Sequence, residues 1–108
     1  MHKIIDSRRE ALAALCRRYD VRRLEVFGSV TSVQFDPGGS DIDFLVDFEP
    51  NAAGSLFHRY FGLHEALASL FGRKVDLVMV GALRNPYFIE SVNRSRELVY
   101  EGTIAQTA

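Results

Sequence analysis

In residues 41–48, Asp-Ile-Asp-Phe-Leu-Val-Asp-Phe, every second residue is apolar, and this period of two predicts a β-strand. The even-numbered residues are apolar and would share one face, while Asp41, Asp43, Leu45 and Asp47 would share the other. Residues two apart on a strand lie roughly 6.5–7 Å from each other. Two carboxylates in that arrangement cannot both be buried without partners, because desolvating each costs several kcal/mol. Asp41 and Asp43 therefore face water, a cation or both, although Asp-X-Asp also occurs as ordinary turn chemistry at the start of a strand.

Two further features support a site. Gly28-Ser29 closes an apolar run at 24–27, and a small-residue turn offers backbone N–H groups and a hydroxyl to phosphate oxygens. Asp76 lies inside a second apolar run, at 75–80, where an ionised side chain is unusual without a partner. An ion pair with Arg73 or Lys74 would explain it. Because magnesium takes carboxylate oxygens and keeps some waters, we favour a metal site that Asp76 shares with Asp41 and Asp43.

The composition describes an ordinary globular chain of 108 residues, 47% hydrophobic and 25% charged. We expect one domain over residues 1–101 and a disordered tail over 102–108. The net charge of −1 argues against a general nucleic-acid binder. A single cysteine, Cys16, excludes an internal disulfide and is expected to pack in a helix. No segment is long and apolar enough to span a membrane, so we expect a cytoplasmic protein.

Hydrophobic spacing and turn residues predict an α/β chain with a small mixed sheet flanked by helices. A capping box, Ser7-X-X-Glu10, predicts where the first helix begins, and Asn85-Pro86 predicts the start of the last. The middle helix has an apolar band wider than one stripe, which is either core or a partner surface. His64 in that helix is expected to be a partly buried structural residue. The expected elements are helices at 7–19, 53–71 and 86–93, strands at 24–27, 41–48, 75–80 and 98–100, a turn at 36–39, and packing residues Tyr87, Phe88 and Val92 in the last helix.

The combination of Gly28-Ser29, Asp41-Ile42-Asp43 and Asp76 resembles the signature of the DNA polymerase beta-like nucleotidyltransferase superfamily. The phrases VFGS, SDIDFLVDF, RKVDLV and ALRNPYF…ELVYEG are most similar to minimal nucleotidyltransferases, over residues 22–101. Those domains are commonly the antitoxins of HEPN-domain ribonuclease toxins. The resemblance implies the polymerase beta-like fold, a HEPN toxin as protein partner in a hetero-oligomer, ATP as substrate and magnesium as cofactor.

The same resemblance implies a role for each site residue. Asp41, Asp43 and Asp76 would hold magnesium, Asp76 would also help to deprotonate the attacking hydroxyl, and Gly28 and Ser29 would hold phosphate oxygens. A hydroxyl, a tyrosine of the toxin in the antitoxin pairs, would attack the α-phosphorus of ATP and release pyrophosphate. The attached AMP would silence the ribonuclease.

One departure from the family pattern keeps two alternatives open. Family members read Gly-Ser-Arg-Ala-Arg-Gly after the first strand, whereas residues 28–40 here contain no lysine or arginine. Basic side chains normally strengthen phosphate contacts. Either magnesium and backbone donors suffice, other basic residues reach in, or the domain is a non-enzymatic antitoxin that acts by contact. Transfer to a small molecule of the aminoglycoside kind is the weaker alternative. The basic residues that could reach in are Arg22, Arg23, Arg73 and Lys74.

Overall fold

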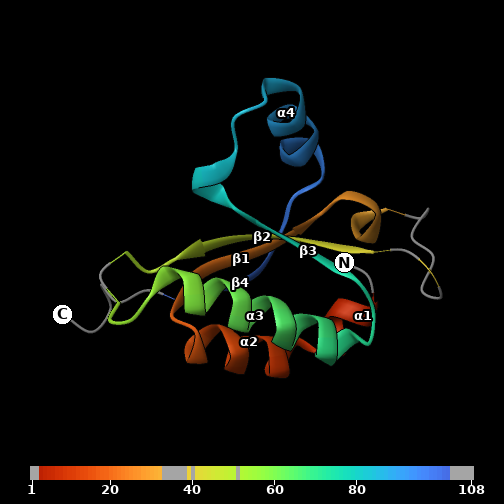
Figure 1. Cartoon of the computed structure of the whole chain (residues 1–108). Coiled ribbons are helices and arrows are strands. Elements are labelled where there is room, and N and C mark those ends of the chain that lie inside the picture. The colour runs from red at the N-terminus through yellow and green to blue at the C-terminus, as the bar shows by residue number, and fades with distance from the viewer. Residues whose placement is uncertain (1–2, 33–38, 40, 51, 103–108) are drawn as a thin grey trace.

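A mixed four-stranded sheet organises the chain in the computed structural model, which describes residues 3–32, 39, 41–50 and 52–102 (Figure 1). The strand order is β3-β2-β1-β4; β1 pairs antiparallel with β2 and β4, and β2 pairs parallel with β3. The expected α/β class with a small mixed sheet is confirmed. The elements are α1 (Lys3–Asp6), α2 (Arg9–Arg18), β1 (Val21–Phe27), the 3₁₀ turn η1 (Gly28–Thr31), β2 (Ile42–Phe48), α3 (Leu56–Phe71), β3 (Val75–Met79), the 3₁₀ turn η2 (Val80–Ala82), α4 (Pro86–Ser95) and β4 (Glu97–Glu101).

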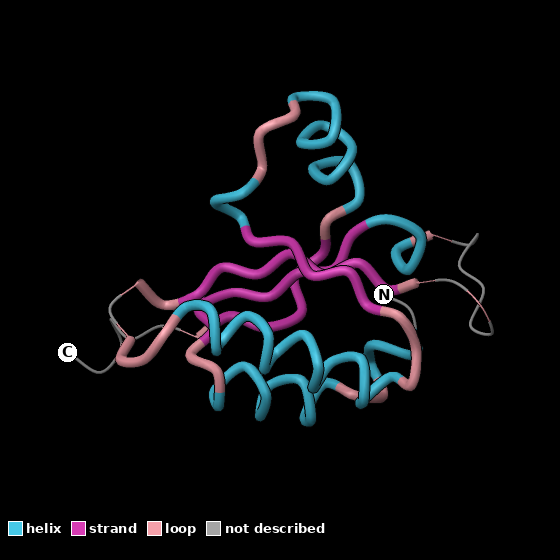
Figure 2. Tube along the Cα trace, in the orientation of Figure 1, coloured by secondary structure: helices cyan, strands magenta, loops and turns pink. Residues whose placement is uncertain are grey.

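The two faces of the sheet are covered unequally (Figures 1 and 2). Helices α1, α2 and α3 lie together on one face, whereas α4 stands alone on the other. The even-numbered apolar residues of β2 are buried under helices α1, α2 and α3, as the alternation predicts. A smaller cluster of Phe27, Leu45 and Val92 joins α4 to the opposite face. The odd-numbered face of β2, with its aspartates, is therefore only partly covered.

Two expectations about the helices are wrong. The capping box does not form, because the Ser7 hydroxyl donates to the Ile4 carbonyl at 3.4 Å and Arg8 takes the N-cap position without a side-chain bond. Tyr87 is not a packing residue, since 82% of its surface is exposed. By contrast, Asn85 caps α4 as expected, with its side-chain oxygen accepting the Tyr87 N–H at 2.9 Å.

Other boundaries differ by a few residues. β1 begins three residues before the expected strand, because Val21 pairs with Phe48. α3 begins at Leu56, where the Ser55 hydroxyl caps it, rather than at residue 53. Cys16 is fully buried in α2, as expected. Most of the turn expected at 36–39 and the tail from residue 103 lie outside the described residues.

Side chains of the helices form hydrogen bonds with backbone carbonyl groups of both edge strands. At the β3 edge, Tyr60 donates to the Leu77 carbonyl and His64 Nε2 lies 2.7 Å from the Val75 carbonyl. At the β4 edge, an Arg9 Nη1 donates to the Val99 carbonyl at 3.2 Å. These bonds protect edge strands that could otherwise pair with another chain, and they give His64 the structural role expected of it. Among the described residues, no helix has the length and apolar character needed to cross a membrane.

Candidate active site

Asp43 and Asp76 lie side by side on the face of the sheet that α4 partly covers. They are register partners in the parallel β2–β3 pair, so two adjacent strands present a carboxylate at the same level. On its other side Asp43 pairs with Phe27, the last residue of β1 before the Gly28-Ser29 turn. Asp43 is half-buried and Asp76 is exposed. The sheet thus brings together three sequence segments that contain Gly28-Ser29, Asp43 and Asp76.

The Asp43 carboxyl is strongly perturbed. Burial raises its pKa to about 6, and the hydrogen bond and negative charge of Asp76 add to that effect, followed by the charge of Asp41. Lys74 acts in the opposite direction. A bound cation would offset the negative charge that disfavours ionisation of Asp43 here.

Asp41 is held differently from the other two acids. It precedes β2, and its carboxylate lies 3.7 Å from the Lys74 ammonium. The lysine considered as a partner for Asp76 is therefore paired with Asp41. Within the described ranges, no three acidic, histidine or cysteine side chains converge into a ready-made ion site. The Asp43–Asp76 pair, with Asp41 at the start of the same strand, still offers the oxygen donors that fit a divalent cation.

The Gly28-Ser29 turn packs directly against Asp43. Gly28 has φ +74°, and a Cβ at this position would lie 2.6 Å from Asp43 Oδ2, so only glycine fits. The Gly28 N–H donates to Ser95 Oγ at 2.9 Å, and Thr31 Oγ1 donates to the Gly28 carbonyl at 2.8 Å. One of the expected phosphate donors is therefore occupied by a hydroxyl from α4. Ser29, at the start of η1, is half-buried.

A buried ion pair fixes the end of α4 against the sheet. Arg96, the C-cap of α4, donates to both Glu25 carboxylate oxygens at 2.6 and 3.0 Å. Only 5% of the Glu25 side chain is exposed, and Arg23 lies 3.6 Å from it. The sequence analysis did not identify this pair. An acid within the apolar run at 24–27 is the signal that could have found it, by the reasoning that singled out Asp76.

A cavity of about 410 Å³ opens beside the carboxylate pair, and its lining extends from β3 across Asp43 of β2 to Phe27 at the end of β1. Phe27 and Phe88 pack edge to face at 5.9 Å between centroids, while Tyr60 and His64 contribute parallel rings from α3. The sequence analysis assigned Phe88 and His64 to packing and did not place them at a site. Only the tertiary structure brings α3 and α4 to the same strand edge. The lining residues are Phe27, Asp43, Tyr60, His64, Val75, Asp76, Leu77, Val78 and Phe88.

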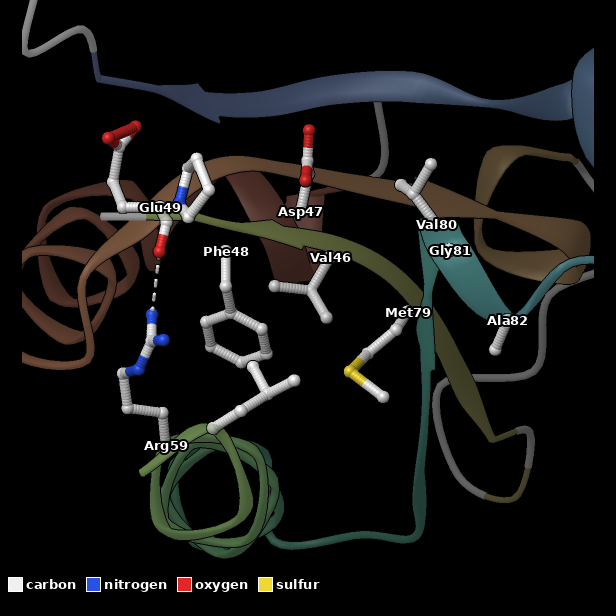
Figure 3. A pocket seen from close by; sticks show the side chains of 11 residues that line it. Val46, Asp47, Phe48, Glu49, Arg59, Met79, Val80, Gly81 and Ala82 are labelled. Atoms are coloured by element: carbon white, nitrogen blue, oxygen red, sulfur yellow. Dashed lines mark hydrogen bonds between the residues drawn. The ribbon is translucent and has the colours of Figure 1, made fainter. Parts of the chain in front are cut away.

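A larger hollow of about 500 Å³ lies at the opposite end of β2 (Figure 3). Phe48 and Met79 are among its apolar lining residues, and Arg59 lies at one side of it, where it donates to the Glu49 carbonyl at 3.2 Å. Asp47, one of the two acids in its lining, is already bonded to Arg22. Because Asp47 and Arg59 have internal partners and the hollow is distant from the Gly28 turn, we assign the chemistry to the Asp43–Asp76 end.

The basic residues considered as substitutes for the missing loop arginines are mostly engaged elsewhere. Arg22 bonds Asp47 at the far end of β2, and Arg23 lies 3.6 Å from Glu25 and from Glu101. Lys74 is at the site, beside Asp41.

This arrangement of a Gly-Ser turn beside paired strand aspartates agrees with comparisons to known proteins. Residues 8–99 match the family model described as a nucleotidyltransferase domain. The chain belongs to the nucleotidyltransferase family. The family resemblance seen in the sequence is thereby confirmed.

Two curated relatives of this nucleotidyltransferase carry names that specify an activity. A protein of Methanocaldococcus jannaschii, provisionally named a protein adenylyltransferase, is 35% identical over 98 residues, which are 91% of this chain and 94% of the relative. The protein adenylyltransferase MntA of Thermococcus cleftensis is 41% identical over 71 residues, 66% of this chain and 68% of the relative.

Solved structures support the same fold. A structure provisionally described as a minimal nucleotidyltransferase matches with a TM-score of 0.69 and 35% identity, covering 90% of this chain and 95% of that one. An MNT antitoxin in complex with a tri-AMPylated HEPN toxin of Shewanella oneidensis matches with a TM-score of 0.61, covering 95% of this nucleotidyltransferase and 77% of that chain. At 17% identity, the second match shows the fold alone.

Proposed function

We propose that this nucleotidyltransferase is a magnesium-dependent protein adenylyltransferase and the antitoxin of a toxin–antitoxin pair. It transfers AMP from ATP to a hydroxyl, a tyrosine in our proposal, of a HEPN-type ribonuclease, with which it forms a hetero-oligomer. The observation that carries the proposal is the Asp43–Asp76 pair packed beside the Gly28 turn. The 35% identical relative named a protein adenylyltransferase supports a protein as the acceptor.

Each site residue has a part in this proposal. Asp41, Asp43 and Asp76 provide the oxygens that hold magnesium, and the ion supplies charge neutralisation for the triphosphate when bound. Gly28 lets the chain approach Asp43 closely, and Ser29 offers its N–H and hydroxyl to the phosphates beyond the scissile bond. Asp76, the more exposed of the two paired carboxylates, accepts the proton of the attacking hydroxyl.

The mass of the acceptor protein provides the direct test. The product of the neighbouring gene is incubated with this protein, ATP and magnesium, and its intact mass is measured. We expect the addition of one or more AMP units, which disappears when Asp43→Asn replaces the wild type. Transfer that persists in both Asp41→Asn and Asp43→Asn would refute the proposed chemistry.

A second candidate function, neutralisation by contact alone, is favoured by one surface. Leu56, Phe57 and Phe61 of α3 are 47%, 65% and 53% exposed, which is unusual for large apolar side chains on one helix. A contact antitoxin would bind its toxin there and need no transfer. It predicts that Asp43→Asn still silences the ribonuclease, with no change of mass in the toxin.

We further propose that residues 1–101 work as one domain and that the protein acts in the cytoplasm. The match to the family model over residues 8–99 supports the first of these proposals.

A further inference from the structure

The last residue of α4 lies opposite the Gly28 turn. The pairing of β1 with β4 ends at Val26 and Glu97, and two residues further on the same antiparallel register would set Gly28 opposite Ser95. Ser95 ends α4, so no strand continues there to accept the Gly28 N–H through its backbone. The side-chain hydroxyl of Ser95 takes that place and accepts the N–H at 2.9 Å.

Three separate contacts fix the backbone of Gly28. Ser95 accepts its N–H, and Thr31 Oγ1 donates to its carbonyl at 2.8 Å. On its third side, a Cβ would lie 2.6 Å from an oxygen of Asp43. Glycine is the most flexible residue, so a turn built on it keeps one conformation only when its neighbours hold it. These contacts therefore set the direction in which the next residue, Ser29, projects.

The hydroxyl of Ser95 is itself held in place by α4. It donates to the Ser91 carbonyl one turn earlier, at 3.4 Å. The next residue, Arg96, donates to both carboxylate oxygens of Glu25, whose side chain is only 5% exposed. Helix α4 stands alone on its face of the sheet, so its position depends on contacts of this kind (Figure 1). Two adjacent residues thus fasten the end of α4 to β1 and to the turn.

Ser29 is the residue of this turn that is left to meet a substrate. Its carbonyl accepts the Ser32 N–H at 3.0 Å, whereas its hydroxyl has no hydrogen-bond partner in the part of the chain that the structure describes. A hydroxyl both donates and accepts hydrogen bonds, and on a fixed turn it is suited to phosphate oxygens. Its usefulness depends on the turn that carries it.

We propose that Ser95 is a positioning residue for the transfer reaction: by accepting the Gly28 N–H, it orients the turn so that Ser29 meets the phosphates of ATP beyond the scissile bond. The inference rests on the proposed function, which places a triphosphate at this turn. Ser95 itself does not touch the substrate. Without its hydroxyl, the half-buried Gly28 N–H loses its acceptor and the turn gains access to other conformations, to which the missing Cβ sets little limit.

Binding of α,β-methylene-ATP in the presence of magnesium provides the test, because this analogue is not cleaved between its α- and β-phosphates. Its Kd is measured by calorimetry for the wild type, Ser95→Ala, Ser95→Thr, Ser29→Ala and the double variant of Ser29→Ala with Ser95→Ala. Ser91→Ala is the matched control, since it removes an exposed hydroxyl from the same helix and leaves the Ser91 carbonyl in place. Thermal unfolding verifies that each variant is folded, and amide exchange of Gly28, followed by NMR, reports the hydrogen bond directly.

We expect Ser95→Ala to raise the Kd by about tenfold, the effect of roughly one lost hydrogen bond, and to speed exchange of the Gly28 amide. Ser95→Thr keeps the hydroxyl and should restore most of the affinity, and Ser91→Ala should match the wild type. In the double variant the loss should be smaller than the two single losses combined, because both changes act on one phosphate contact.

Four results would overturn the inference. They are an unchanged Kd in Ser95→Ala, a folded Ser95→Thr that binds no better than Ser95→Ala, and losses that combine fully in the double variant. The fourth is tighter binding by Ser95→Ala, which would mean that the Gly28 N–H itself binds phosphate when Ser95 releases it.

The measurements also separate this inference from the proposed function. If the wild type binds the analogue and Ser95→Ala binds it equally well, only the role of Ser95 is refuted. If the wild type does not bind the analogue with magnesium, even though its Gly28 amide is protected from exchange, the proposed function itself fails.

Discussion

Replacing Asp43 with asparagine should make the metal-free protein more stable while it removes activity. Above its raised pKa of about 6, the ionised Asp43 carboxylate destabilises the folded state, because its ordinary pKa is 3.8. A difference of about two pKa units corresponds to about 3 kcal/mol at 1.36 kcal/mol per unit. Since Asp43 is only half-buried, solvent screening reduces this to about 1–2 kcal/mol. An asparagine amide avoids the charge and can still donate to Asp76.

Thermal unfolding in EDTA at pH 8 and pH 5 provides the assay. For a domain of this size, about 1–2 kcal/mol should raise Tm by about 5–10 °C at pH 8. The penalty in the wild type fades as the pH falls through about 6 and is gone below 3.8, so the gap between variant and wild type should narrow at pH 5. Asp41→Asn is the comparison variant, because it removes an ion pair with Lys74 and only the smallest of the effects that raise the Asp43 pKa, so it should raise Tm by less than Asp43→Asn does. An Asp43→Asn variant that is no more stable than the wild type at pH 8, or whose advantage is undiminished at pH 5, would refute the reasoning.

Two substitutions and one labelling experiment test further parts of the structure. Glu25→Gln should lower the free energy of unfolding by about 1–3 kcal/mol in denaturant titrations, because the Arg96 guanidinium, one third of whose side chain is exposed, loses its buried carboxylate partner. Since that guanidinium lowers the Glu25 pKa, its stabilisation is present above the ordinary pKa of 4.5 and is lost as the pH falls below it; acid titration of the wild type and Glu25→Gln checks this loss. Gly28→Ala should be more destabilising than Gly72→Ala: both have positive φ, but only at Gly28 would a Cβ collide with Asp43, and equal losses of Tm would contradict this account. The Cys16 thiol, with its pKa raised to about 12 by burial, should resist iodoacetamide at pH 8 until the protein unfolds, so rapid labelling of the folded protein would contradict its burial.

Most of the architecture could be predicted from short-range patterns. The alternation over 41–48 predicted both faces of β2, and Asn85-Pro86 predicted where α4 begins, because strand periodicity and helix caps depend on neighbouring residues. The capping box at Ser7 failed for a local reason too, since its hydroxyl donates to the Ile4 carbonyl one turn earlier and does not cap the helix. A serine side chain near a helix start can bond several nearby backbone groups, and the sequence does not determine which of these hydrogen bonds forms.

Some features of the candidate site could be predicted from neighbouring residues, and others depended on contacts between distant segments. Asp43 was singled out because two carboxylates two residues apart on a strand cannot both be buried without partners, and Gly28 because a small-residue turn offers N–H groups to phosphate. That Asp43 pairs in register with Asp76, and that Lys74 pairs with Asp41 instead, depended on the parallel β2–β3 register. Register is fixed by the packing of a whole face, and no residue in either strand specifies it alone.

By itself, the sequence determined which residue types could perform phosphate and metal chemistry, and on which strands they would lie. The tertiary structure decided which of them meet: it packed the Gly28 turn against Asp43, fixed the end of α4 through Glu25 and Arg96, and brought Phe88 and Tyr60 to one cavity. The physical reason is the range of the interactions. Periodicity and turn chemistry act over a few residues, whereas a buried ion pair or a shared cavity joins segments that only the closed core brings together.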